Sequence, residues 1–337
     1  MPRIAVDAMG GDNAPQEIVA GAVQAARDGI AVVVLVGDRS AIEACADAKD
    51  LAGIEIVDVR GVPVAMDEHA AQAARRAGET SLGVAVNLVR DGKAAAVISA
   101  GNTGAFHAIA LLSLGRIRGV KRPAIATVLP APAGPVLLLD AGANVDCKPE
   151  YLLQFGLMGD AYARTVMGIA RPRVGVLSIG EEATKGNALT VAAHALLAKA
   201  PVRFVGNVEG KDIMSGGADV VVADGFVGNV VLKFGEGMIT QLFTLLRESI
   251  MSSGILGRLG ALLLSRALRP LGEKLNWERY GGAPLLGLQG ICIVTHGRAK
   301  ALAIRNSIQA AAVAVNRGLV TTIADEIANP RESSLRR

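Results

Sequence analysis

Short, uniformly apolar segments separated by longer helical patterns restrict the fold of this chain more than any other feature. Residues 32–36 read VVVLV and residues 220–223 read VVVA, without the polar alternation of a strand that has one face in water. Such strands are typical of a parallel sheet covered on both faces. We therefore expect a three-layer α/β/α fold with a doubly wound, mostly parallel sheet and right-handed crossover helices.

The same periodicity predicts the position of each element. Strands are expected at residues 4–8, 32–36, 54–57, 95–99, 124–129, 136–140, 174–179, 202–205, 220–223, 284–288 and 291–295. Helices are expected at residues 15–27, 41–48, 67–77, 81–91, 104–114, 149–169 and 299–317. We expect one catalytic domain over residues 1–330, interrupted by a helical insertion at 225–275 and followed by a frayed tail at 331–337.

Composition excludes several classes of protein. Hydrophobic residues make up 51% of the chain and aromatic residues only 3%, so the core must be aliphatic. The net charge of +4 is too small to indicate a nucleic-acid partner. Cys45, Cys147 and Cys292 lie far apart and are odd in number, which fits a reducing cytoplasm. The N-terminus runs directly into a strand-like segment, so we expect no signal peptide.

Polar, glycine-containing segments follow strand after strand. They occupy residues 7–15, 99–105, 140–146, 179–187, 206–212, 223–229 and 295–298. Ligands of open α/β sheets bind at the carboxyl ends of the strands, so seven such segments predict one shared crevice. Glycines after strands are also ordinary turn residues, and each segment taken alone remains open to that reading.

One of these segments indicates an anion site. Ser99, Asn102, Thr103 and Gly104 lead into a helix start, where free backbone N–H groups and the helix dipole favour an anion. A helix cap at Asn102 or Thr103 is compatible with that function. Lys185 is a candidate counter-charge, or else a solvated loop lysine. The first β–α turn has no dinucleotide fingerprint and the chain has no P-loop, so a nucleotide is not favoured.

Other polar residues of the segments are candidate ligands of a substrate or organisers of their own loops. They are Asp7, Asp12, Asn144, Asp146, Glu182, Asn207, Asp224, Asn229 and His296. The short side chains of Asp7 and Asp12 are equally suited to hold their own loop, and His296 is slightly favoured as a structural histidine. Cys147 is a conceivable acyl carrier, although a cysteine is more often a small packing residue. The carboxylates are scattered without His or Cys clusters, so no metal is expected.

Taken together, the segments resemble one family. The matching runs, in chain order, are IAVDAMGGDNAP, SAGNTGA, LLDAGANVD, IGEEATKGN, GNVEGKD, DVVVADGFVGNVVLK and GAPLLGLQGICIVTHG. Between residues 4 and 297 they are similar to the acyl-ACP:phosphate acyltransferases of bacterial phospholipid synthesis. One departure follows Gly297, where Arg298 and Ala299 stand in place of a small hydroxyl residue.

The resemblance implies a fold similar to isopropylmalate dehydrogenase and phosphotransacetylase. It implies transfer of a fatty acyl group from acyl carrier protein to inorganic phosphate, giving an acyl phosphate for phosphatidic acid synthesis. It also implies a homodimer, no metal or organic cofactor, and a cytoplasmic protein peripherally associated with the inner face of the cell membrane. The product would pass to a glycerol-3-phosphate acyltransferase in that membrane.

This reaction needs positioning more than acid–base chemistry, because phosphate is already nucleophilic and a thiolate leaves easily. We expect Ser99, Asn102, Thr103, Gly104 and Lys185 to hold phosphate. We expect Asn144, Asn207 or Asn229 to position the thioester or its oxyanion.

The helical insertion is basic and amphipathic. Leucines follow one another at helical spacing, interrupted by Arg258, Arg266, Arg269 and Lys274. Three uses of this pattern stay open: contact with membrane or an acyl chain, packing in a dimer, and docking of the acidic carrier protein.

Two other functions compete with acyl transfer. A metal- and NAD-dependent decarboxylating dehydrogenase of the same fold would need clustered aspartates and an arginine set, and we find no such arginine set. A non-enzymatic membrane scaffold would have no use for the dense polar segments after the strands.

Overall fold

The computed structural model describes residues 1–328. Within this range it describes the backbone but not the side chains at positions 256–258, 262, 263, 265, 267, 268, 270, 271, 275 and 277. The strands are β1 (Arg3–Asp7), β2 (Val32–Gly37), β3 (Glu55–Asp58), β4 (Ala96–Ser99), β5 (Ala124–Leu129), β6 (Val136–Leu139), β7 (Arg173–Leu177), β8 (Arg203–Val208), β9 (Val220–Val222), β10 (Ala283–Leu286) and β11 (Ile291–Val294).

The helices are α1 (Gln16–Arg27), α2 (Arg39–Glu43), α3 (Ala70–Arg75), α4 (Ser81–Arg90), α5 (Thr103–Leu114), α6 (Pro149–Thr165), α7 (Ala188–Leu197), α8 (Gly210–Ser215), α9 (Gly225–Ser252), α10 (Gly254–Leu275), α11 (Ala301–Asn316) and α12 (Leu319–Ala328), with short 3₁₀ turns η1 (Ala77–Glu79) and η2 (Trp277–Tyr280). The helix expected at 67–77 is shorter and divided between α3 and η1, and α12 was not predicted.

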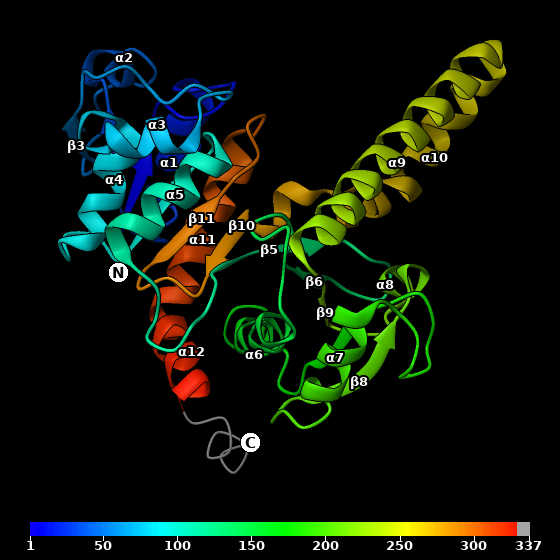
Figure 1. The fold of residues 1–337 in the computed structure, drawn as a ribbon. Coiled ribbons are helices and arrows are strands. Elements are labelled where there is room, and N and C mark those ends of the chain that lie inside the picture. The colour runs from blue at the N-terminus through cyan, green and yellow to red at the C-terminus, as the bar shows by residue number, and fades with distance from the viewer. Residues whose placement is uncertain (329–337) are drawn as a thin grey trace.

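All the strands named above join one sheet, in the order β3-β2-β1-β4-β11-β10-β5-β6-β9-β7-β8. The pairings from β3 to β11 are parallel, and so are those from β6 to β8. In the middle, β10 is antiparallel to both neighbours, and β5 is antiparallel to β6. The expected α/β fold with a mostly parallel sheet is confirmed, and the reversals in the middle divide it into two parallel parts (Figure 1).

Helices cover both faces of the sheet, and strand residues alternate between them. Ile4 and Val6 of β1 pack with one buried cluster, whereas Ala5 between them packs with another. The first cluster includes residues of α1, α6, α11 and α12, and the second includes residues of α3, α4 and α5. This two-sided burial is the reason that the strands lack polar alternation.

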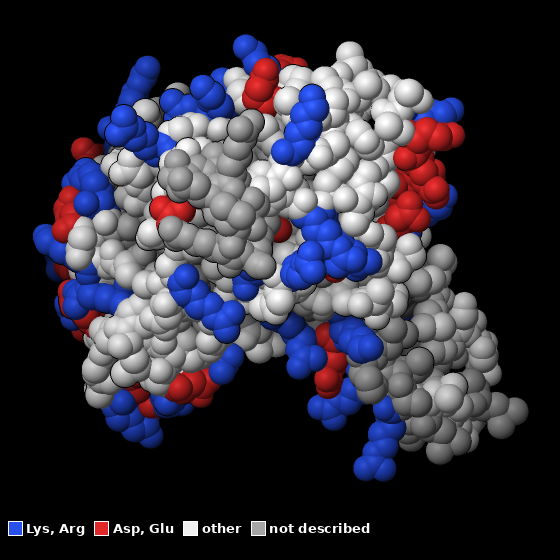
Figure 2. All heavy atoms as spheres, turned by 90° about the horizontal axis from the view of Figure 1, so that it is seen from below, with Lys and Arg blue, Asp and Glu red and all other residues white. Residues whose placement is uncertain are grey.

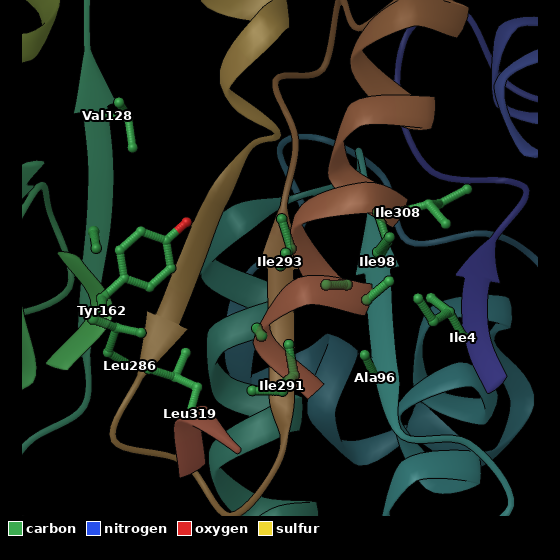
Figure 3. Packing of buried hydrophobic residues seen from close by; sticks show 14 of the residues in the cluster. Ile4, Ala96, Ile98, Val128, Tyr162, Leu286, Ile291, Ile293, Ile308 and Leu319 are labelled. Carbon is green, nitrogen blue, oxygen red and sulfur yellow. The ribbon is translucent and has the colours of Figure 1, made fainter. Parts of the chain in front are cut away.

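Aliphatic side chains fill the core where the antiparallel strands lie. Figure 3 shows part of one buried cluster, which includes Ile98 of β4, Ile293 of β11, Leu286 of β10, Ile308 of α11 and Tyr162 of α6. Each of these side chains is almost fully buried. Burial of one large aliphatic side chain contributes roughly 1.5–3 kcal/mol, so this packing fixes the two parts of the sheet relative to each other.

Helices α9 and α10 pack against each other and project from the body as a long arm (Figure 1). They occupy the stretch where the sequence indicated a helical insertion. Much of the surface of α9 is apolar and exposed, including Phe226 at 61% and Phe234 at 68%. Among the described residues, no helix is both long and apolar enough to cross a membrane.

Candidate functional site

The N-terminus of α5 presents free backbone donors at the carboxyl end of β4. Asn102 caps the helix, because its Oδ1 accepts from the N–H of Ala105 at 3.0 Å. Its amide nitrogen donates to three carbonyls of residues 65–68, so the Asn102 side chain is fully used within the protein. Thr103 and Gly104 are exposed at the first two helical positions. Their N–H groups have no intrahelical acceptor and favour an anion.

Beneath this helix start lies a buried carboxylate. Asp7, at the end of β1, is 2% exposed and accepts from the hydroxyls of Ser81 at 2.6 Å and Ser99 at 2.7 Å. The Oγ of Ser99 in turn accepts from the N–H of Gly101 at 3.0 Å. Ser99 is itself 1% exposed, so its hydroxyl fixes the loop around the predicted phosphate site.

The space between residue 10 and Asp7 is too small for a side chain on residue 10. A Cβ on Gly10 would lie 2.5 Å from Oδ2 of Asp7 and 2.9 Å from the backbone nitrogen of Gly101. The glycine-containing loop after β1 can therefore close over Asp7 only because residue 10 has no Cβ. Of the two readings left open for Asp7, its geometry matches the organiser of a loop.

Replacement of Asp7 by asparagine is expected to change both stability and its dependence on pH. Burial raises the pKa of Asp7 above its ordinary value of 3.8, so the folded state binds this proton more tightly than the unfolded chain. The contribution of Asp7 to stability is therefore full below pH 3.8 and declines as the pH rises through its raised pKa. Urea unfolding across that range should give a flatter pH profile for Asp7→Asn, with a loss of about 1–3 kcal/mol. An unchanged profile would contradict this role.

Three segments at this end of the sheet form the first loop group: residues 7–13, 99–104 and 295–298. The N–H of Asp12 donates to the carbonyl of Gly297 at 2.8 Å, which joins two of them. The Asp12 side chain is exposed, and so is His296, whose Nδ1 accepts from the N–H of Arg298 at 3.2 Å. Arg298, noted in the sequence only as a departure from the family pattern, adds an exposed cation to this group.

The second loop group consists of residues 140–146, 178–187, 206–212 and 223–229, and its centre is Asp140. One carboxylate oxygen of Asp140 accepts from the N–H groups of Ile125, Gly142 and Ala143. The other accepts from both the backbone and the side chain of Asn144, at 2.7 and 2.8 Å. Burial raises the pKa of Asp140 above its ordinary value, and the hydrogen bonds that the carboxylate accepts offset only part of this rise. The Asn144 amide also donates to the carbonyl of Pro123 at 2.8 Å, so it helps to hold this loop.

The first turn of α9 packs directly on the Asp140 loop. Asp224 caps the helix by accepting from the N–H of Val227, and the N–H of Gly225 donates to the carbonyl of Asn144. Asn229 lies over Gly142 and is exposed. Its side chain forms no hydrogen bond within the part of the chain that the structure describes. Of the asparagines that were candidates for the oxyanion, Asn229 has the free amide.

Asn207 organises the loop that carries Lys185. Its amide donates to the carbonyls of Gly180 and Glu182, at 3.0 and 2.8 Å, and its Oδ1 lies 2.8 Å from Nδ1 of His194. The side chains of Lys185 and Glu182 are exposed. Asp146 is also exposed, in the loop after β6. The structure therefore assigns Asn207 a supporting contact and leaves Lys185 available to an external anion.

Cys147 is poorly suited to carry an acyl group. Burial raises the pKa of its thiol to about 11, so the thiolate is rare at neutral pH. Its Sγ donates to the carbonyl of Asn144 at 3.4 Å. In residues 1–328, no cluster of three or more His, Cys, Asp or Glu side chains could hold a metal ion.

His107, in the second turn of α5, lies near Asp140 of the second loop group, on the helix that begins in the first group. It lies one turn after Thr103 on the same helix face. Burial lowers its pKa, whereas the nearby Asp140 raises it. Its Nε2 is buried and has no hydrogen-bond partner among the described residues. Ala141 and Ala143 pack in the same cluster as neighbouring residues of α5, which brings the second group beside the helix that begins in the first.

The sequence identified the loops of both groups but not how they divide. Thr103 and Gly104 belong to the first group, whereas Lys185 belongs to the second. No hydrogen bond or ion pair between described residues joins Thr103 or Gly104 to Lys185. His107 was missed because it stands within an apolar helix, where only its polarity distinguishes it.

The basic residues of the arm differ in their surroundings. Arg269 forms an ion pair with Glu273 at 3.1 Å, which reduces its availability to a partner. Arg266 and Lys274 are exposed. The side chain of Arg258 lies outside the described residues.

Comparison with known proteins gives matches over nearly the whole chain. A family model described as fatty acid synthesis protein matches residues 2–322. A phosphate acyltransferase of Moorella thermoacetica is 53% identical over 324 residues, covering 96% of this chain and 95% of that protein. The phosphate acyltransferase of Heliobacterium modesticaldum is 51% identical over 328 residues, covering 96% of this chain and 97% of that protein.

Solved structures with the same fold are much more distant in sequence. A phosphotransacetylase of Streptococcus pyogenes aligns with a TM-score of 0.63 at 14% identity, over 94% of each chain. A phosphotransacetylase of Staphylococcus aureus aligns with a TM-score of 0.61 at 15% identity, over 93% of this chain and 94% of that one. These likenesses show the fold.

Proposed function

Because the chain belongs to the fatty acid synthesis protein family, with phosphate acyltransferases as close relatives, we propose that it transfers a fatty acyl group from acyl carrier protein to inorganic phosphate. The chain is an acyltransferase enzyme of lipid synthesis. The proposal concerns the donor, acyl carrier protein, and the product, acyl phosphate. The observation that carries it is the exposed start of α5, where the backbone N–H groups of Thr103 and Gly104 have no intrahelical acceptor and suit a phosphate acceptor.

In this mechanism we expect the N-terminus of α5 to hold the phosphate dianion, with Lys185 of the second loop group as the proposed counter-charge. One phosphate oxygen attacks the thioester carbonyl carbon, and the carbon–sulfur bond breaks as the carbon–oxygen bond is completed. The proton of the phosphate passes to the departing thiolate, so atoms and charge balance without a cofactor. Asn229 supplies a hydrogen bond to the oxyanion, because its amide is free of other partners.

The supporting residues fix this geometry. Asp7 and Ser99 hold the loop beside Thr103, and Asp140 and Asn144 hold the loop beneath Asn229. Because the groups are held by buried hydrogen bonds, they need little reorganisation when substrate binds.

Incubation with acyl carrier protein charged with a fatty acid and radiolabelled phosphate tests the proposal. We expect labelled acyl phosphate to accumulate with release of the carrier thiol in equal amount. Fatty acid release without a labelled acyl phosphate would contradict the acceptor. The dehydrogenase alternative predicts NAD reduction with a divalent metal in the same preparation.

We also propose a homodimer that associates peripherally with the inner face of the cell membrane and passes its product to a glycerol-3-phosphate acyltransferase. The exposed apolar residues of α9 support contact with a second subunit, a lipid surface or an acyl chain. The exposed basic residues Arg266 and Lys274 suit an anionic membrane surface.

A further inference from the structure

A short loop between α5 and β5 carries four cations and no acid. Residues 115–122 read GRIRGVKR, and Arg116, Arg118, Lys121 and Arg122 are all exposed. None of the four forms an ion pair within the described part of the chain. Most charge runs in proteins are simply solvated, so further observations are needed to assign this one a partner.

The loop is rigid. Ile117 and Val120 are buried, which anchors it to the body. The N–H of Lys121 donates to the side chain of Gln154 at 2.8 Å, and the same side chain donates to the carbonyl of Gly119 at 2.9 Å. The cations are therefore presented from a fixed backbone, which reduces the entropy lost when a partner binds.

The loop also adjoins the second loop group. Pro123, the next residue, accepts from the amide of Asn144, which in turn donates to Asp140. The Arg122 guanidinium lies 5.9 Å from the centre of the Tyr151 ring in α6. A partner on this loop would lie beside the proposed thioester site.

One exposed apolar side chain accompanies the cations. Leu112, in the last turn of α5, is 76% exposed, four residues before Arg116. An apolar contact bordered by charges is the composition expected of a protein–protein interface.

We propose that Leu112 and residues 116–122 form the docking surface for the acidic carrier protein that delivers the acyl thioester. The inference rests on the proposed function and specifies where its donor binds.

A nucleic acid would need a continuous basic surface. Figure 2 shows Lys and Arg side chains in separate groups among neutral and acidic residues on the face in view. The limited, fixed set of charges fits a small acidic protein.

The test uses the double variant Arg118→Glu, Lys121→Glu. These side chains make no hydrogen bond with any described residue, so folding should be preserved. We expect the KM for the charged carrier protein to rise about tenfold at low salt, and to lose most of its salt dependence. The rate with a small thioester donor, acyl-N-acetylcysteamine, should stay within about twofold of wild type, because that donor has no acidic surface.

The matched control is Arg171→Glu, Lys199→Glu, which makes the same charge change at two other exposed residues without an ion pair among the described residues. If both double variants raise the carrier KM equally, the effect is one of net charge and the docking surface is wrong. A wild-type enzyme that makes acyl phosphate from neither donor would instead contradict the proposed function. The double variant is also compared with wild type for binding to phospholipid vesicles. If it binds vesicles less tightly but keeps its KM for the carrier protein, the loop contacts a membrane and the proposal is overturned.

Discussion

Replacement of Gly228 by alanine is expected to destabilise the protein by about 2–4 kcal/mol and to lower turnover by more than about 100-fold. A Cβ at this position would lie 1.9 Å from the carbonyl oxygen of Asp140 and 3.0 Å from its carbonyl carbon. Both atoms are backbone, so no side chain can move aside. The Asp140 side chain is also tied to Ile125 and Asn144, which resist any shift of the loop. The first turn of α9 must move away instead, and Asn229 moves with it.

Gly237 provides a control in the same helix. It is exposed, and a Cβ there would meet no heavy atom within 4 Å. Gly237→Ala should therefore stabilise the helix by about 0.5–1 kcal/mol through the lower backbone entropy of alanine. Chemical unfolding and the acyl phosphate assay measure both variants. A Gly228→Ala protein as stable and active as Gly237→Ala would show that the α9 start does not depend on this close contact.

The alternation of apolar runs and helical patterns was enough to predict a mostly parallel, two-sided sheet. It was not enough to predict the direction of β10 in the middle of the sheet. The segment around Leu286 is as apolar as a parallel strand because it is buried on both faces, yet β10 runs antiparallel to both neighbours. Burial determines the composition of a strand, whereas direction depends on connections distant in the sequence.

The loops were also predictable, but the use of each polar residue was not. Ser99 and Asn102 were expected to bind phosphate, and in the structure their side chains bond to Asp7 and to residues 65–68. The bond from Ser99 to Asp7 spans 92 positions in the sequence. A single sequence shows that a hydroxyl follows a strand, but its partner comes from another loop brought near by the sheet.

Loss of the Lys185 ammonium is the second change for which we expect a large effect, an approximately 100-fold lower kcat/KM for phosphate in Lys185→Ala. The proposed acceptor is a dianion, and this lysine is the cation assigned to it. The loop itself should survive. Its contacts use the Lys185 backbone, whose N–H donates to the carbonyl of Glu182 and whose carbonyl accepts from Ser178. Stability should therefore change by no more than about 0.5 kcal/mol, as for most exposed side chains.

Two further variants separate charge from position. Lys185→Arg keeps the positive charge and should recover part of the lost activity, with the change mainly in the phosphate KM. Lys211→Ala removes an exposed lysine in the first turn of α8 that is paired with Glu209, and it should leave turnover unchanged. Initial rates at varied phosphate concentration measure all three. Equal activity of Lys185→Ala and Lys211→Ala would remove Lys185 from the phosphate site, and Arg298 of the first loop group would then be the exposed cation to test.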